Sequence, residues 1–318
     1  MAQTRTDAGR AFTPAPLVRV LVACLVVGVV VSGCGPSVPP AEPESVFGET
    51  GLGPGEFSYP RAIAVAPDDA VFVVDKSGRI QRFDPDGHVE VVWQMPEYAA
   101  GKPTGMTVHP DGRLFVADTH YHRVLVFDRD GQELARFGEE GTGPGQFLLP
   151  TDVAFDAEGR VYVSEYGGND RISRFSPDFE FELSFGGPDS GAARLTRPAS
   201  MVFDKEGMLW VADACNHRLC RFDPEGRLWQ IIDRMGRDRG ELRYPYDVDL
   251  LDDGTLVVCE YGNNRLQWFS PSGESLGVWG GAGRRPGQLA YPWGVAYNSA
   301  GRLYVVDSGN NRVQVLVP

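Results

Sequence analysis

The stretch "LYVVDSGNNRVQVL", residues 303–316, contains the pattern that decides the fold. A short apolar run ends in an acid, Asp307, and after a polar loop a second apolar run opens with Arg312. Apolar runs of four or five residues between polar turns are typical of buried β-strands. Two close copies, "LVVCEYGNNRLQWF" (256–269) and "LWVADACNHRLCRF" (209–222), show that the stretch is one instance of an internal repeat.

The repeat runs through most of the chain, and each unit opens with a proline. Successive prolines are 43, 47, 48, 47 and 47 residues apart: Pro60, Pro103, Pro150, Pro198, Pro245 and Pro292. After each proline come an apolar strand, a tight turn, a strand ending in an acid, a polar loop, a third strand opened by arginine, a second turn and, in the first five units, a fourth strand. Four short strands in six units predict an all-β, six-bladed propeller of four-stranded antiparallel blades.

The last unit contains only three strands before Pro318. Residues 44–49 ("ESVFGE") are similar to the fourth strand of the second unit, "ELARFGEE" at 133–140. We therefore expect the N-terminal strand to complete the last blade and close the ring. The top face is defined as the end that carries connectors such as "GLGPGEFSYP" (51–60) together with the acid-to-arginine loops. Because a fourth strand runs upward, the chain is expected to enter at the bottom.

The repeat resembles the NHL repeat most closely at 212–222, 259–269 and 306–316. The resemblance extends over about 44–318 and implies the propeller fold. It says little about activity, because NHL propellers serve in enzymes, kinase sensors and ubiquitin ligases. Six-bladed amidating lyases share this repeat, and in that family the zinc histidines directly follow the opening proline. Here that position is never histidine, which argues against a lyase.

The N-terminal residues are expected to lie outside the fold. Residues 1–34 have the features of a lipoprotein signal peptide, since arginines precede a twelve-residue apolar run and "VSGC" (31–34) resembles a bacterial lipobox. The alternative is an ordinary signal peptide with a chance cysteine. Residues 35–43 form a Pro-rich linker, and 44–318 form the propeller. We expect lipid on Cys34 to anchor the protein to a bacterial membrane in the cell envelope, outside the cytoplasm.

The formal net charge is −13, which argues against a nucleic-acid partner because phosphate binding requires a basic surface. We expect a monomer whose top face points away from the membrane and binds a protein or a small ligand.

An acid and an arginine recur at nearly fixed spacing in every unit, and we expect each pair to brace its loop. A ring of carboxylates that holds a cation is the alternative. The pairs are Asp75–Arg79, Asp118–Arg123, Glu165–Arg171, Asp213–Arg218, Glu260–Arg265 and Asp307–Arg312.

The residue after each opening proline should line the upper channel, and it differs between units. Arg61, Tyr246 and Trp293 would form an aromatic wall with one cation, which favours a planar, anionic or amphipathic ligand. The other three positions hold Thr104, Thr151 and Ala199. Tyr166 and Tyr261, each in an "EYG" sequence, complete the aromatic candidates.

Asp152 and Asp247 stand one position further along, where two other units have Gly105 and Gly294. They could hold a divalent cation or share a structural water.

Other chemistry has weaker signals. Histidines occur in the loops "THYH" (119–122) and "CNH" (215–217), but His217 stands where Asn264 and Asn311 occur, which suggests a generic loop role. No "GxSxG" motif or Cys–His signature is present. Cys215 and Cys220 flank one loop and could form a disulfide or remain idle thiols.

The sequence thus favours a non-catalytic binding or sensor module with no cofactor. The alternative is a metal-assisted lyase or lactonase with its site in the central channel.

Overall fold

The computed structural model describes residues 42–318. The predicted signal peptide, Cys34 and almost all of the predicted linker lie outside the described residues. None of the described helices is long and apolar enough to cross a membrane.

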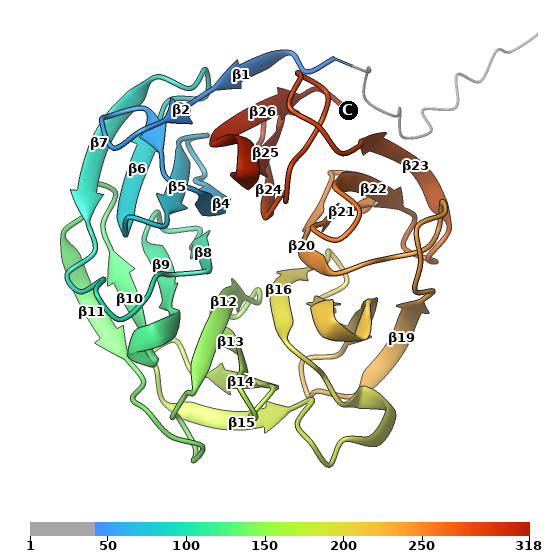
Figure 1. The fold of residues 1–318 in the computed structure, drawn as a ribbon. Helices are drawn as coiled ribbons and strands as arrows, with labels where there is room; N and C mark the ends of the chain where they lie inside the picture. The colour runs from blue at the N-terminus through green and yellow to red at the C-terminus, as the bar shows by residue number, and fades with distance from the viewer. Residues whose placement is uncertain (1–41) are drawn as a thin grey trace, which may run out of the picture. The chain divides into compact units, whose positions relative to one another are not determined.

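Six four-stranded antiparallel sheets surround a central channel, so the predicted six-bladed propeller is confirmed (Figure 1). Blade 1 contains β4 (Pro60–Val65), β5 (Val71–Asp75), β6 (Arg79–Phe83) and β7 (Val89–Gln94). Blade 2 contains β8 (Gly105–Val108), β9 (Leu114–Asp118), β10 (Arg123–Phe127) and β11 (Glu133–Phe137). Blade 3 contains β12 (Leu149–Phe155), β13 (Val161–Tyr166), β14 (Arg171–Phe175) and β15 (Phe181–Phe185).

Blade 4 contains β16 (Pro198–Phe203), β17 (Leu209–Asp213), β18 (Arg218–Phe222) and β19 (Leu228–Asp233). Blade 5 contains β20 (Pro245–Leu250), β21 (Leu256–Glu260), β22 (Arg265–Phe269) and β23 (Ser275–Gly280). Blade 6 contains β24 (Gly294–Tyr297), β25 (Leu303–Asp307), β26 (Arg312–Leu316) and, from the N-terminal end, β1 (Ser45–Phe47). The first strand of each blade faces the channel (Figure 1).

The apolar core lies between neighbouring blades. Six clusters of buried side chains each join two adjacent sheets, and the second strand of every blade is buried almost throughout. The cluster between blades 1 and 6, for example, includes Phe83 from one blade and Val315 from the other. Since burying one large apolar side chain stabilises a fold by about 1.5–3 kcal/mol, each interface contributes to keeping the ring closed.

Blade 6 is completed by β1, as the sequence predicted. Ser45, Val46 and Phe47 pair with Val315, Gln314 and Val313 of β26. The Phe47 ring then packs on Phe83 of blade 1, with ring centroids 5.1 Å apart. Gly87 leaves room for this ring, because a Cβ there would lie 2.5 Å from Phe47.

Four of the six connectors between the described blades share one backbone pattern. Short parallel pairings occur between β2 (Glu49–Thr50) and β3 (Glu56–Phe57), and as single bridges at Glu140–Phe147, Met235–Leu242 and Ala282–Leu289. These connectors lie at the same end of the blades as the acid-to-arginine loops, since the loop arginines donate to connector carbonyls.

Candidate functional site

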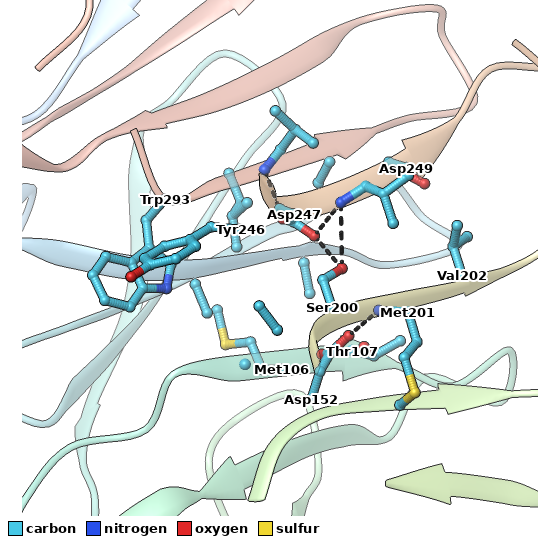
Figure 2. Close-up of a pocket in the computed structure, with 18 of the residues that line it drawn as sticks. Met106, Thr107, Asp152, Ser200, Met201, Val202, Tyr246, Asp247, Asp249 and Trp293 are labelled. Carbon is cyan, nitrogen blue, oxygen red and sulfur yellow. Dashed lines mark hydrogen bonds between the residues drawn. The ribbon is translucent and has the colours of Figure 1, made fainter. Parts of the chain in front are cut away.

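A cavity of about 210 Å³ occupies the channel, and the first strand of each blade provides its wall. Five of the six residues that follow the opening prolines line it: Arg61, Thr104, Ala199, Tyr246 and Trp293. The sixth, Thr151, lines a smaller recess at the mouth together with four of these five residues, Thr104, Ala199, Tyr246 and Trp293. Tyr246 and Trp293 lie against one another at one end of the cavity, while Asp152, Ser200 and Asp247 lie along its wall (Figure 2).

Aromatic rings gather at the mouth of the channel. Tyr246 stacks on Tyr261 at 4.6 Å between centroids, and Trp293 meets Tyr246 edge-on at 4.9 Å. Tyr59 approaches Trp293 at 6.3 Å, and burial raises the pKa of the Tyr59 phenol, with the nearby Tyr261 phenol adding to that rise. The mouth therefore presents rigid, flat apolar surfaces with phenol groups at their edges.

Two arginines lie over these rings. The Arg61 guanidinium is 5.2 Å from the Trp293 centroid, and that of Arg197 is 4.8 Å from Tyr166 and 5.2 Å from Tyr246. Among the described residues, no carboxylate lies within 4.0 Å of either guanidinium. The Nε atom of Arg61 is buried without a hydrogen-bond partner. Burial lowers the pKa of Arg61, and the charge of Arg197 lowers it further.

Tyr59 and Arg197 owe their position to the backbone just before the opening proline. Both have a positive φ (56° and 57°), as do Tyr244 and Tyr291 at the same position in blades 5 and 6. A left-handed conformation is costly for a bulky residue, and each is held by a bond from its N–H to the preceding blade. The four acceptors are Asn311, Asp170, His217 and Asn264, at 2.6–3.0 Å. Sequence reasoning missed Tyr59 and Arg197, although a bulky residue directly before the proline recurs in several units and was an available signal.

The channel carboxylates are tied to the blade that follows them. Asp152 accepts the Met201 N–H at 2.8 Å, and Asp247 accepts the Val295 N–H at 2.8 Å. The Ser200 hydroxyl donates to Asp247, so Ser200 stands between the two acids (Figure 2). These contacts satisfy backbone groups at the inner edge of the sheets, which have no strand partner on the channel side.

Burial dominates the acidity of these groups. It raises the pKa of Asp247 to about 7 and that of Asp249 to about 6. Burial also raises the pKa of Asp152, and the nearby charge of Asp247 adds to that rise. Around neutral pH, part of this carboxylate population is therefore protonated and can donate a hydrogen bond.

Each of the six acids at the end of a second strand forms an ion pair with its arginine. The distances run from 2.6 to 2.9 Å: Asp75–Arg79, Asp118–Arg123, Glu165–Arg171, Asp213–Arg218, Glu260–Arg265 and Asp307–Arg312. All six acids are buried. In five blades the arginine also donates to connector carbonyls, so the pair fixes the connector to the loop.

The histidines and cysteines are dispersed. His217 accepts the Tyr244 N–H, which is the same role that Asn264 and Asn311 play for their neighbours. No group of three His, Cys, Asp or Glu side chains that could hold a metal ion occurs in residues 42–318. Cys215 is exposed and Cys220 is buried, and both are free thiols, as is buried Cys259.

Comparison with known families finds the NHL repeat at residues 195–222, 242–269 and 289–316. A family described as a 6-bladed beta-propeller matches residues 102–181. The chain therefore carries NHL repeats within a six-bladed propeller, as the resemblance in its sequence indicated.

Curated relatives match over parts of their length. Peptidylglycine alpha-amidating monooxygenase of Rattus norvegicus is 30% identical over 142 residues, which cover 43% of this chain and 12% of that protein. Protein brain tumor of Drosophila melanogaster is 32% identical over 85 residues, which cover 26% of this chain and 8% of that protein. The chain thus spans about an eighth or less of these two relatives.

Solved structures match over most of the chain. A streptogramin B lyase structure superposes with a TM-score of 0.63 at 15% identity, covering 86% of this chain and 97% of the other. A protein of unknown function from Bacteroides thetaiotaomicron superposes with a TM-score of 0.62 at 15% identity, covering 86% and 76%. At such identities the likeness is one of fold.

Proposed function

We propose that this NHL-repeat propeller is a non-catalytic binding module whose site is the mouth of the central channel. Its ligand is an anion attached to a flat apolar group, either a small molecule or an exposed group on a partner protein. The observation that carries the proposal is the pair of arginines at the mouth, Arg61 and Arg197, for which the described chain provides no carboxylate within 4.0 Å.

Two like charges gathered in a half-buried site raise the free energy of the empty protein. A bound anion would relieve their repulsion and would give the Arg61 Nε–H the hydrogen bond that it lacks. The six arginines of the acid–arginine pairs, by contrast, each contact a buried acid. Arg61 and Arg197 are half-buried side by side at the mouth without such a partner.

The rings determine what the anion is attached to. Tyr246 and Trp293 stand at a wide angle of 65° to one another, which leaves a flat group room to lie on one ring while its edge meets the other. The cavity volume of about 210 Å³ suits a ligand portion of roughly the size of one substituted ring. Because braced loops hold the rings, binding requires little reorganisation.

Benzoate and benzamide test the proposal, since the two have nearly the same shape and only benzoate is charged. We expect benzoate to bind the purified protein measurably more tightly than benzamide in ligand-observed NMR titrations. Arg61→Met and Arg197→Met should each weaken benzoate binding about tenfold or more, the usual effect of losing a charge-assisted hydrogen bond.

Arg284→Met is the matched control, because Arg284 is exposed on a connector outside the channel lining. It should leave benzoate binding unchanged. Equal binding of benzoate and benzamide, or equal effects of the three substitutions, would contradict the proposal.

A metal-assisted lyase or lactonase is the second candidate. The observation in its favour is the Asp152–Ser200–Asp247 group, whose carboxylates have raised pKa values and line the channel. Elemental analysis of the purified protein separates the two: stoichiometric bound metal favours the enzyme, and a stable metal-free protein counts against it.

We further propose that lipid on Cys34 holds the propeller at a bacterial membrane, in the cell envelope, as a monomer. The lipobox-like "VSGC" supports the anchor, and the upward course of β1 from the bottom of blade 6 supports a mouth that points away from the membrane. Cys34→Ser should move the protein from the membrane fraction to the soluble fraction.

A further inference from the structure

Five of the six blades fasten their incoming connector in the same way. The backbone N–H two residues before the opening proline donates to the acid at the end of the second strand, at 2.7–3.0 Å. The five pairs are Ser58–Asp75, Leu148–Glu165, Thr196–Asp213, Arg243–Glu260 and Ala290–Asp307. Most of these clamps include a return bond from the loop after the acid, such as Cys215 N–H to the Thr196 carbonyl at 3.0 Å.

Blade 2 does not make this clamp. The equivalent donor is the N–H of Gly101, and no bond joins it to Asp118. The Oδ1 atom of Asp118 is buried without a hydrogen-bond partner, and the whole residue is inaccessible to solvent. Burial raises the pKa of this carboxyl to about 6 against the influence of Arg123. The carboxylate that accepts a connector N–H in the five other blades therefore accepts none in blade 2.

The connector of blade 2, residues 95–102 between β7 and β8, is fastened to other groups instead (Figure 1). Arg123 pairs with Glu97 rather than with connector carbonyls. The Ala100 N–H donates to the Tyr121 hydroxyl at 3.0 Å, and the Lys102 N–H donates to His120 at 3.3 Å. Met95 anchors the start of this connector, since its side chain is buried and its N–H donates to the Gly78 carbonyl at 2.8 Å. The bonds of residues 96–102 are long or exposed, so little free energy holds that part in its position.

Lys102 occupies the position directly before the opening proline. In blade 4 the same position holds Arg197, and in blade 1 it holds Tyr59, both of which reach the channel mouth. Lys102 instead lies over the Tyr98 ring, at 4.8 Å, with its ammonium donating to the Tyr98 carbonyl. Its neighbour Thr104 already lines the channel, so Lys102 is close to the mouth without entering it.

We propose that residues 96–102 form a strap with a second, docked position, in which the Gly101 N–H caps Asp118 and Lys102 enters the mouth as a third cation. This inference rests on the proposed anion site. Docking without an anion brings Lys102 toward Arg61 and costs Coulomb repulsion, whereas a bound anion turns that cost into attraction. The ligand therefore favours the docked strap because its affinity for the two positions differs.

Affinity provides the first test. Lys102→Met should weaken benzoate binding about two- to fivefold, as expected for a partly exposed ion pair, and should leave benzamide binding unchanged. Lys102→Arg should retain the affinity for benzoate. Lys205→Met, which removes an exposed lysine that bonds to the Asp252 carbonyl, is the matched control and should have no effect.

Hydrogen exchange measured by mass spectrometry provides the second test. Saturating benzoate should protect about two or three further amides in peptides that cover residues 96–104 and 118–122, since the clamp of other blades contains that many bonds. Glu97→Ala removes the ion pair with Arg123 that holds the strap in its undocked position. This substitution should therefore produce part of the protection without benzoate. Glu90→Ala, which removes an exposed partner of Arg82, should produce none.

The outcomes separate the strap from the site. Benzoate binding with no change at these peptides and no change in Glu97→Ala overturns the strap and leaves the anion site standing. Protection without an effect of Lys102→Met overturns the role of Lys102. If benzoate does not bind at all, the anion site is wrong, and exchange in ligand-free Glu97→Ala decides the strap alone.

Discussion

Asp247 illustrates how single residues serve both the ring and the channel. Its two oxygens accept bonds from Ser200, Val248 and Val295, which join blades 4, 5 and 6 at the channel wall. Because Asp247 is buried in this arrangement, its pKa rises from the ordinary 3.8 to about 7. Between these two values the folded protein binds more protons than the unfolded chain, so this group destabilises the fold progressively as the pH rises.

The pH dependence of unfolding tests this reading of Asp247. Between pH 5 and pH 8 the wild-type protein should lose on the order of 1–3 kcal/mol relative to Asp247→Asn, because the neutral amide has no charge to bury. Urea unfolding at both pH values measures the difference. Asp189→Asn, on an exposed loop, should follow the wild type. Parallel pH profiles of wild type and Asp247→Asn would show that Asp247 is not the responsible group.

At the scale of elements, the brace between acid and arginine is the repeated part that fixes loop and connector together. Glu260 is fully buried, and Arg265 joins it to the carbonyls of Arg237, Asp238 and Glu241. Removing one partner of such a pair leaves a buried charge without compensation. The resulting loss of folding free energy is larger than the net stabilisation that the intact pair provides.

Arg265→Met should therefore destabilise the protein by about 3 kcal/mol and lower its Tm. Arg123→Met should cost less, because Arg123 donates to no connector carbonyl and its second partner, Glu97, is exposed. Thermal unfolding followed by circular dichroism measures both. Arg285→Met, on an exposed connector position, serves as control; equal losses for Arg265→Met and Arg123→Met would contradict the role assigned to the connector bonds.

The repeat made the strands, connectors and acid–arginine pairs predictable, because fixed spacing places equivalent residues at equivalent positions. It also placed Arg61, Tyr246 and Trp293 in one channel. It did not place Tyr59 and Arg197 there, since the direction of their side chains depends on a left-handed backbone that spacing does not encode. The open acceptor on Asp118 was likewise out of reach, because a missing bond in one unit leaves its sequence pattern intact.

At the scale of the whole molecule, the two ends of the described chain meet in blade 6. The core between blades 6 and 1 includes Phe57 and Phe83 from one side and Tyr304 and Val315 from the other. Phe47 extends this contact from β1. Closure of the ring therefore depends both on β1, which is the outermost strand of blade 6, and on the apolar side chains buried between blades 6 and 1.

Deleting residues 44–50 within the full chain should expose the edge of β26 and destabilise the ring. Phe47→Ala should reproduce only the lost packing and leave the strand pair in place; because Phe47 is half-buried, the loss should stay below the roughly 3 kcal/mol of a fully buried aromatic side chain. Urea unfolding measures stability, and size-exclusion chromatography detects association through the exposed edge. A deletion that unfolds at the same urea concentration as wild type would show that β1 is not needed for closure.

The position of β1 also has a mechanical consequence. Any tension transmitted along the chain from residues before Glu44 reaches the propeller first at this three-residue strand. A force that pulls the N-terminal end of β1 outward along the strand axis loads the hydrogen bonds between β1 and β26 in shear. The bonds then bear the force together rather than one after another. The covalent path through the other blades carries no load until β1 slides. The pair of β1 and β26, which closes the ring, would therefore also be the first contact to yield, and it would release the ring between blade 6 and its neighbour, blade 1.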